Sequence, residues 1–314
     1  MAHDPLKVSQ SVLDTASLGT NLINDLSVWL IVGAALLLML VMVLLVRGAW
    51  SGPVPVNSRV WIVAGGLVMP VVVLAALLVQ GVRVGSALAH EPGVQGMEVE
   101  VIARRWWWEF RYRDPHGVEQ VVLANELHLP LDCTAVLTLA SNDVIHSFWV
   151  PALAGKVDVI PGQTHRLIVH ASRTGRFRGQ CAEYCGTQHA NMALEVVVES
   201  PLEFRDWLHH QATPAADAAD PTTQRGQQVF MASGCGSCHS VRGTSATGRL
   251  GPDLTHVAGR RMLAAATLHN DASSLVSWIR HAQHLKPGSL MPSLSHPMDD
   301  EDMRALAAYL GSLH

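Results

Sequence analysis

Two long apolar runs without a charged side chain constrain the fold of this chain more than any other feature. They cover residues 26–46 and 60–82, and each reaches the roughly 20 residues that a helix needs to cross the hydrocarbon core of a bilayer. Only helices and closed barrels satisfy all of their backbone polar groups in lipid. We therefore expect residues 1–95 to form an N-terminal segment and a transmembrane hairpin, in a chain of 314 residues that is 49% hydrophobic and only 15% charged.

A cleavable signal peptide is the alternative for the first run. The run is longer than the apolar core of a signal peptide, no basic segment precedes it, and a second run follows it. The connector between the runs has Arg47 and Arg59 as its only charges, so the positive-inside rule places it in the cytoplasm. Both termini and everything after about residue 90 then lie outside, which for a bacterial chain is the periplasmic side of the inner membrane.

Residues 96–210 have the pattern of a β-domain. Segments such as "CTAVLTLAS", "HRLIVHA" and "ALEVVVES" alternate apolar with polar residues and are separated by Pro, Gly, Asp and Asn, which is typical of short antiparallel strands. The pattern predicts an all-β sandwich or barrel. Residues 211–223, "QATPAADAADPTT", lack large apolar side chains and predict a linker to a separate unit formed by residues 224–314.

Two segments of this β-domain hold soft or borderline metal-binding side chains. His146 lies at a predicted strand end, and the loop "GQCAEYCGTQHANM" contributes Cys181, Cys185, His189 and Met192. Loops gather at one end of a sandwich, so the five donors can meet there. Thiolate, imidazole and thioether donors favour copper and zinc over calcium or magnesium. Two thiolates can bridge two copper ions, each capped by one histidine, with Met192 and a backbone carbonyl as weak axial donors.

Two other interpretations of the loop stay open at this point. Structural zinc uses four ligands and seldom a thioether. A disulfide between Cys181 and Cys185 fits an oxidising compartment, but it leaves His146, His189 and Met192 unexplained. Spacing alone favours a metal over the disulfide.

The C-terminal unit contains Cys235-x-x-Cys238-His239, the spacing for two thioether bonds to a haem whose iron binds the histidine. A redox pair or half of a zinc site are the alternatives for an isolated Cys-x-x-Cys. Residues 223–234 and 299–313 predict helices on either side, the second with acidic residues in its first turn. Met291 is our choice for the sixth iron ligand; the competing candidates are Met262, Met298, Met303, His284 and His296.

The segments "SNDVIHSFWVPAL", "VDVIPGQ" and "GQCAEYCGTQHANM" closely resemble the dinuclear copper (CuA) domain of subunit II of the haem-copper cytochrome c oxidases, a cupredoxin-like sandwich. The resemblance implies that the copper ligands are the side chains of His146, Cys181, Cys185, His189 and Met192 and the main-chain carbonyl of Glu183. It also implies that the Glu183 carboxylate reaches a magnesium ion shared with subunit I. In "RRWWWEFRY" it makes Trp106 the point where electrons enter the copper site.

The segment "KPGSLMPSL", which includes Met291, resembles the axial-methionine loop of class I cytochromes c. A membrane hairpin, a CuA domain and a C-terminal all-α cytochrome c domain together resemble subunit II of the caa-type oxidases. That resemblance implies electron transfer from a covalent haem c to CuA and on to the haem of subunit I, where oxygen is reduced and protons are pumped. The implied partners are subunits I and III, cytochrome c or a quinol–cytochrome c reductase as donor, and the lipid bilayer; nucleic acid is not an expected partner.

Two features stand outside the family pattern. Many members have a glutamate before the second span, near the equivalent of Trp61, whereas this chain has Ser58 and Arg59, so proton uptake by that route is not expected from the sequence. We expect Cys133 to be a buried small side chain.

The rival functions are the CuA-bearing entry subunit of a nitric-oxide reductase and a membrane-tethered electron shuttle.

Overall fold

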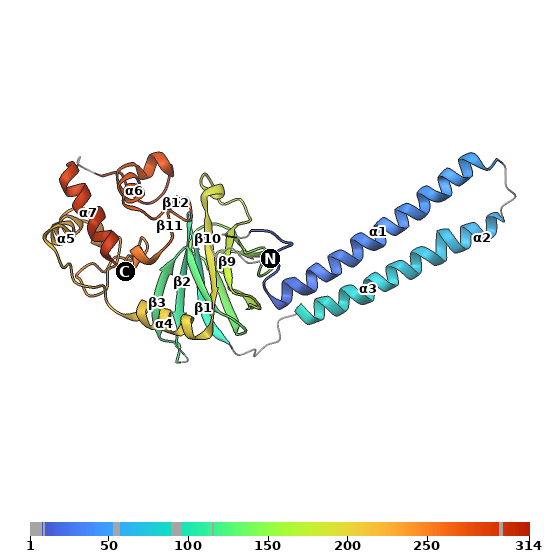
Figure 1. Ribbon diagram of the computed structural model, residues 1–314, viewed down its shortest axis with the longest axis horizontal. Coiled ribbons are helices and arrows are strands. Elements are labelled where there is room, and N and C mark those ends of the chain that lie inside the picture. The colour runs from blue at the N-terminus through green and yellow to red at the C-terminus, as the bar shows by residue number, and fades with distance from the viewer. Residues whose placement is uncertain (1–7, 9, 53–56, 89–95, 115, 295–297) are drawn as a thin grey trace. The chain divides into compact units, whose positions relative to one another are not determined.

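The computed structural model describes residues 8, 10–52, 57–88, 96–114, 116–294 and 298–314 (Figure 1). It divides the chain into two compact units, residues 18–94 in one and residues 1–17 with 95–314 in the other. His296, one of the candidate iron ligands, lies outside the described residues.

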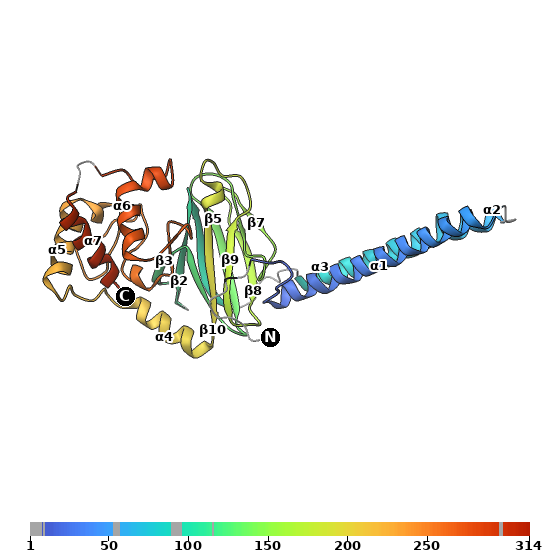
Figure 2. The same ribbon diagram turned by 45° about the horizontal axis from the view of Figure 1, so that its top comes forward.

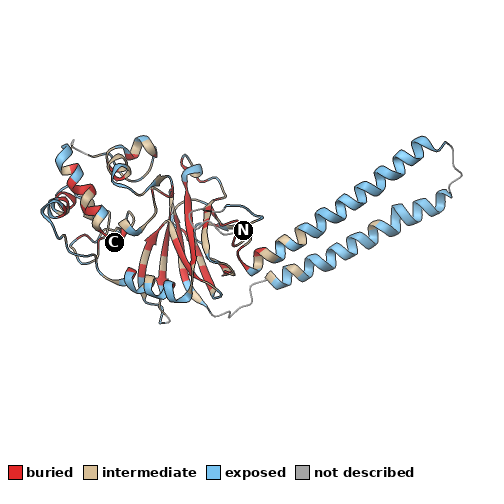
Figure 3. Cartoon of the chain, in the orientation of Figure 1, coloured by how far each residue is buried: buried red, intermediate tan, exposed pale blue. Residues whose placement is uncertain are grey.

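The first unit is a helical hairpin, as predicted. Its elements are α1 (Leu18–Trp50), α2 (Ser58–Val63), η1 (Ala64–Val68) and α3 (Met69–Leu88). The helical stretches contain 33 and 31 residues and are long and apolar enough to cross a membrane. At a rise of about 1.5 Å per residue they extend about 50 Å, beyond the roughly 30 Å of a hydrocarbon core. Their side chains are exposed along almost the whole length (Figure 3), so lipid or partner helices have to cover them.

The second helical stretch contains a π-helical turn at η1. Pro70 lies two residues after the end of this turn. It has no N–H to donate, and its ring crowds the carbonyl four residues earlier, at Gly66. A single π-turn in an α-helix accommodates such a break in the hydrogen-bond ladder. The helix therefore continues through Pro70 to Leu88.

The β-domain is a sandwich of two five-stranded sheets (Figure 2). One sheet has the order β3 (Glu119–Ala124), β2 (Trp107–Arg113), β1 (Met97–Arg104), β5 (Thr134–Ser141) and β8 (His165–His170). The other has the order β4 (Glu126–Pro130), β10 (Ala193–Glu199), β9 (Gly175–Cys181), β6 (His146–Trp149) and β7 (Val157–Val159). The predicted sandwich is confirmed, but β1 with β5 and β10 with β4 pair in parallel rather than antiparallel.

Aromatic side chains fill the space between the two sheets. Trp108 is fully buried and meets Phe148 edge to face, with ring centroids 5.2 Å apart. Burying an aromatic side chain of this kind contributes roughly 2–3 kcal/mol relative to exposure. Trp106 lies in the turn between β1 and β2, not in a strand, so its side chain is outside the alternating pattern of either strand.

Cys133 is exposed, so the expectation that it is buried was wrong. It follows Asp132, whose φ of 54° marks a turn, and it comes just before β5 begins at Thr134. The apolar alternation of β5 starts one residue later than the sequence pattern suggested. Cys133 therefore faces solvent at the strand entrance.

Helix α4 (Pro201–Ala212) follows β10 and packs on the sandwich. His128 on β4 stacks on Trp207 of α4, with ring centroids 3.9 Å apart and ring planes at 8°. Its two ring nitrogens contact Glu199 Oε1 at 2.7 Å and Glu126 Oε1 at 2.9 Å. This buried ion cluster holds the start of α4 to the sheet edge.

The cytochrome c-like part is helical, as predicted. Its elements are α5 (Pro221–Ala232), η3 (Cys235–Ser237), η4 (Val257–Gly259), β11 (Met262–Leu263), β12 (Leu268–His269), α6 (Ala272–Leu285) and α7 (Asp300–Ser312). Helices α5 and α7 begin with aspartate caps, Asp220 and Asp299, that accept backbone N–H groups of the first turn, as such residues commonly do.

Residues 213–220 connect α4 to α5 and contact the cytochrome part. The Ala215 N–H donates to the Arg242 carbonyl at 2.9 Å, and Ala215 and Ala218 pack against the apolar core. The predicted linker 211–223 includes the end of α4 and the start of α5. Its role as a tether stays a prediction.

Gly226 should be irreplaceable at the crossing of α5 and α7. A Cβ atom there would collide with the Ala305 carbonyl and lie 2.7 Å from Tyr309 Cβ. We expect Gly226→Ala to lower the free energy of unfolding of the cytochrome part by about 3 kcal/mol, because a packed core resists an added methyl group. Urea unfolding of the full chain followed by circular dichroism measures it. Gly259→Ala, with no neighbour within 4 Å, is the control, and an equal effect of both variants would contradict the packing argument.

The His128 cluster predicts a pH window of stability. Burial opposes the charged ring, but the hydrogen bonds to Glu126 and Glu199 outweigh it and raise the His128 pKa above its usual 6.5. Burial likewise opposes the Glu126 carboxylate, yet the hydrogen bond from His128 lowers its pKa below 4.5. The histidine contribution is complete below pH 6.5 and is lost as pH rises through the raised pKa; the glutamate contribution is complete above pH 4.5 and is lost as pH falls through the lowered one.

We therefore expect His128→Gln to cost about 2 kcal/mol of unfolding free energy between roughly pH 4.5 and 6.5, and less outside that range. Denaturant titrations of wild type and variant across this range measure the difference. His116→Gln, at an exposed histidine, is the control. A difference for His128→Gln that does not vary with pH would exclude an ion cluster.

Candidate metal and haem sites

The strand pairing of the second sheet assembles the sulfur loop. Strand β9 ends at Cys181, and β6 starts at His146 and pairs with β9 so that Phe148 lies opposite Cys181. The Cys181 N–H donates to the Met192 carbonyl at 2.9 Å, which closes the loop from the other side. A short helix, η2 (His189–Asn191), places His189 above the loop. Two segments about 35 residues apart are thereby brought to one end of the sandwich.

All five predicted donor side chains meet there. Cys181 Sγ lies 3.7 Å from Cys185 Sγ and 3.8 Å from His146 Nδ1. Cys185 Sγ lies 3.6 Å from His189 Nδ1 and 3.8 Å from Met192 Sδ. The Glu183 carbonyl accepts from the Cys181 thiol at 3.2 Å. Each cysteine is therefore next to a different histidine, and the two sulfur atoms lie between them.

The cluster is buried from solvent. Cys181 is 3% exposed, Cys185 is 4% exposed, and Met192 and His146 are fully buried. The contact between the two thiols shifts their pKa values in opposite directions: it lowers the pKa of Cys181 to about 3 and raises that of Cys185. The pair therefore gives up its first proton more readily than an ordinary cysteine does, which favours metal binding by the two sulfurs.

Asp143 orients His146, a contact that the sequence analysis missed. Its Oδ1 lies 2.8 Å from His146 Nε2, which directs Nδ1 at Cys181. Burial opposes a charged His146, but the hydrogen bonds and charges of Asp143 and Cys181 together outweigh it and raise the His146 pKa. Asp143 also accepts the Arg105 N–H at 2.7 Å and the Val144 N–H at 2.7 Å. Its place three residues before His146, in a Ser-Asn-Asp turn, was the available signal.

Trp106 contacts the cluster through its indole. The indole N–H donates to the Cys185 carbonyl at 2.9 Å, and the side chain is 7% exposed. Gly186 has a φ of 112°, and a Cβ atom there would lie 3.1 Å from the Trp106 ring. The left-handed glycine thus lets the indole approach the cysteine loop.

The Cys-x-x-Cys-His segment forms its own site in the cytochrome part. Cys235 begins the turn η3, and His239 Nδ1 bonds to the Pro252 carbonyl at 2.8 Å. Because Nδ1 has a partner, Nε2 is left as the coordinating nitrogen. Burial lowers the His239 pKa, which favours the neutral ring. A Cβ atom on Gly251 would lie 2.5 Å from the His239 ring, so only glycine permits this ring position.

The candidate axial methionines differ in their environments. Met291 lies on the loop after α6, half-buried against the apolar core, and its carbonyl accepts from Gln283 Nε2 at 2.6 Å. Met303 is 1% exposed inside α7, in agreement with its predicted packing role. Met262 lies in β11, Met298 is half-buried just before α7, and His284 is exposed on α6.

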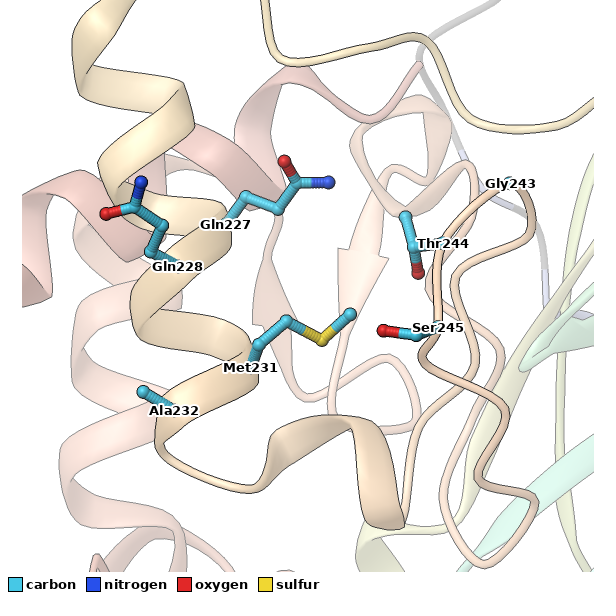
Figure 4. Close-up of a pocket in the computed structure, with 7 residues that line it drawn as sticks. All are labelled: Gln227, Gln228, Met231, Ala232, Gly243, Thr244 and Ser245. Carbon is cyan, nitrogen blue, oxygen red and sulfur yellow. The ribbon is translucent and has the colours of Figure 1, made fainter.

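A surface depression of about 640 Å³ lies between α5 and the loop of residues 243–245 (Figure 4). It is lined by Gln227, Gln228, Met231, Ala232, Gly243, Thr244 and Ser245. None of these residues is a predicted haem ligand. The depression is thus not the predicted haem site.

Comparisons with known proteins agree with this architecture. Residues 115–200 match the family "Cytochrome C oxidase subunit II, periplasmic domain", and residues 223–314 match the cytochrome c family. The "Cytochrome c oxidase subunit 2" of Alkalihalophilus pseudofirmus is 34% identical over 251 residues, which cover 78% of this chain and 71% of that protein. The chain belongs to the cytochrome c oxidase subunit 2 family. The predicted membership, including the fused cytochrome c domain, is confirmed.

Two further relatives are similar to this subunit 2 chain. The "Cytochrome c oxidase subunit 2" of a Bacillus species is 30% identical over 263 residues, covering 78% of this chain and 72% of that protein. The crystal structure of the periplasmic domain of subunit II of cytochrome oxidase of Bradyrhizobium japonicum is 27% identical, with a TM-score of 0.35, covering 38% of this chain and 95% of that domain.

Asp143 should support both the fold and the metal affinity of the β-domain of residues 96–210, which we call the copper-type domain. We expect Asp143→Ala to lower the unfolding free energy of the metal-free chain by about 2 kcal/mol, since two backbone N–H groups lose their acceptor. We also expect it to weaken binding of Cu(I), a soft ion that suits this donor set, by about 10–100-fold. Denaturant unfolding and a competitive Cu(I) titration measure the two effects. Asp206→Ala, at an exposed side chain of α4, should change neither, and wild-type Cu(I) affinity in Asp143→Ala would refute the orienting role.

Proposed function

We propose that this chain is the electron-entry subunit of a terminal cytochrome c oxidase, in which one polypeptide binds a covalent haem c and a dinuclear copper centre. The observation that carries the proposal is the convergence of five soft donors and one carbonyl, with Trp106 bonded to the cysteine loop. The same chain contains the Cys-x-x-Cys-His segment in a cytochrome c fold. An isolated electron shuttle would need only the second of these features.

The donor cluster fits copper by its chemistry and by its spacing. Donors that share one ion at a bond length of about 2.3 Å and tetrahedral angles lie about 3.8 Å apart, and the contacts between neighbouring donors span 3.6–3.8 Å. Two thiolates, two imidazoles and a thioether suit copper better than a hard ion. His146, Cys181, Cys185, His189 and Met192 would hold the two ions, with the Glu183 carbonyl as a sixth donor.

The haem fits the cytochrome domain equally well. Cys235 and Cys238 would form the thioether bonds, and His239 Nε2 and Met291 would be the iron ligands. Leu254, Val276 and Met291 are apolar side chains that stay only partly covered at the edge of the core, as expected where a flat apolar group completes the packing. A thioether axial ligand raises the reduction potential.

When bound, these groups would supply one-electron chemistry, with the haem as the entry point and copper as the donor to the haem of subunit I. The residues of the chain position the ligands and exclude water. Asp143 fixes the ring of His146, and Trp106 forms a hydrogen-bonded contact between the domain surface and the Cys185 carbonyl. The buried cysteines keep water away from the metal, which favours fast one-electron transfer over side reactions.

The surroundings of the chain follow from the same assignment. The helical hairpin would anchor it in a bacterial inner membrane with both termini and both redox domains on the periplasmic side. Subunit I, with subunit III, would cover the hairpin and support oxygen reduction coupled to proton pumping, and cytochrome c or a quinol–cytochrome c reductase would be the donor. The Glu183 carboxylate is 44% exposed, with Lys156 3.9 Å away, and would offer an oxygen to a magnesium ion shared with subunit I.

Metal and haem analysis of the full chain tests the proposal. After expression with copper and cytochrome c maturation, we expect two copper atoms and one covalent haem per chain. Cys185→Ser should lose the paired copper while keeping the haem, because one bridging sulfur is gone. Cys133→Ser, at an exposed cysteine, should keep both. A folded wild-type chain with haem but no copper would refute the assignment.

A further inference from the structure

The cytochrome and copper-type domains belong to the same compact unit of the structure, and one lysine joins them. Lys286 ends α6 and is 3% exposed. Its Nζ donates to the Trp106 carbonyl at 2.8 Å, the Asn191 carbonyl at 2.8 Å and the Ala264 carbonyl at 3.1 Å. Two of these acceptors belong to the copper-type domain and one to the cytochrome domain.

We propose that Lys286 is a positioning residue that docks the methionine loop of the cytochrome domain against Trp106, the electron-entry residue. The inference rests on the proposed function for its consequence, but its geometry is independent of any bound group. An ammonium has three N–H donors, and the three carbonyl acceptors match them in number, while burial lowers the pKa of Lys286 to about 7. Such a site replaces the water that a buried charge loses.

The residues after Lys286 extend the contact. The Pro287 carbonyl accepts from Gln188 Nε2 at 3.0 Å, and Gln188 is 4% exposed beside the cysteine loop. Gly288 has a φ of 81°, and a Cβ atom on it would lie 3.4 Å from Trp106 Cη2. The backbone of residues 286–288 therefore packs on the indole, three to five residues before Met291.

The loop is also tied to its own helix. Gln283 on α6 donates to the Met291 carbonyl at 2.6 Å and accepts the Gly288 N–H at 3.1 Å. A displacement at Lys286 is therefore transmitted to the loop that holds Met291.

A turn of the cytochrome domain next to Lys286 makes a second contact with the copper-type domain. Residues Ala264, Ala265 and Ala266 all have a positive φ, between 52° and 60°, which is unfavourable for alanine. Their carbonyls face the junction: Ala264 accepts from Lys286 and Ala265 accepts the Ala193 N–H at 3.3 Å. Nearby, Arg261 Nε lies 3.3 Å from Glu195. The Ala266 carbonyl accepts from Arg178 Nη1 at 3.5 Å, so all three successive carbonyls of the strained turn have partners.

The consequence is a fixed entry route. The loop that offers Met291 contacts Trp106, and Trp106 bonds to the Cys185 carbonyl. One electron leaving a reduced haem iron, which becomes ferric, and reducing the copper pair by one electron would cross this contact. The docked geometry would raise the effective concentration of the donor well beyond that set by a flexible tether.

Lys286→Met tests the proposal, because it keeps the apolar stem and removes all three N–H donors. Hydrogen exchange of the full chain is the first readout and needs neither cofactor. We expect exchange of residues 286–290 and 104–108 to rise about tenfold or more, and the haem-to-copper transfer rate, measured by rapid photoreduction, to fall about tenfold or more. Haem content and copper content should match wild type. Arg205→Met, at a 71% exposed cation of α4, is the control.

Each outcome decides one claim. Unchanged exchange in Lys286→Met overturns the docking, and increased exchange with an unchanged transfer rate overturns the positioning role. A wild-type chain that lacks haem or copper refutes the proposed function instead, and the exchange comparison still tests the docking. If Lys286→Met does not fold, Gln188→Leu removes the neighbouring contact to Pro287 and is tested by the same two readouts.

Discussion

The pairing of β9 with β6 on one side and β10 on the other is the constraint on which the site depends. It places His146 beside Cys181 and returns the chain at Met192 onto the Cys181 N–H. Because side chains alternate along a strand, a slip of one residue in either pairing would turn the donors away from one another. The aromatic core under β6, with Trp108 against Phe148 and His146, makes such a slip costly. The strand register of the sandwich thus determines whether the donor side chains meet.

Polar contacts between elements then set the finer geometry. Asp143 fixes His146 from the loop before β6, and the indole of Trp106 reaches the Cys185 carbonyl from the turn between β1 and β2. Lys286 reaches the backbone of that same turn from the cytochrome domain. Each contact satisfies buried N–H donors that would otherwise cost free energy. These contacts connect the methionine loop to the cysteine pair, from Lys286 to Trp106 and from Trp106 to Cys185.

Much of this could be predicted from the sequence, because the strongest signals are local. The two uncharged runs predicted α1 and the helix through α3, and the donor spacing from Cys181 to Met192 predicted a cluster. The Cys-x-x-Cys-His motif predicted the second site, and the acidic start of residues 299–313 predicted α7. Family resemblance added the roles of the Glu183 carbonyl and of Trp106. The structure shows how these residues contact the cysteine loop, while copper and haem ligation stay predictions.

What the sequence did not predict depends on tertiary contacts. The parallel pairing of β1 with β5 has no local signature, and Cys133 lies outside the strand because the chain turns at Asp132. Lys286 resembles an ordinary charged residue at a helix end, and only the packing of two domains buries it. The π-turn before Pro70 follows from proline chemistry, but its length depends on how the helix accommodates the break.

The most direct test of the central claim is an electron paramagnetic resonance spectrum of the oxidised full chain loaded with copper. If Cys181 and Cys185 bridge two ions, one unpaired electron is shared between two copper nuclei, and the hyperfine pattern shows coupling to both. A spectrum with coupling to a single copper nucleus would contradict the dinuclear centre on which the account rests.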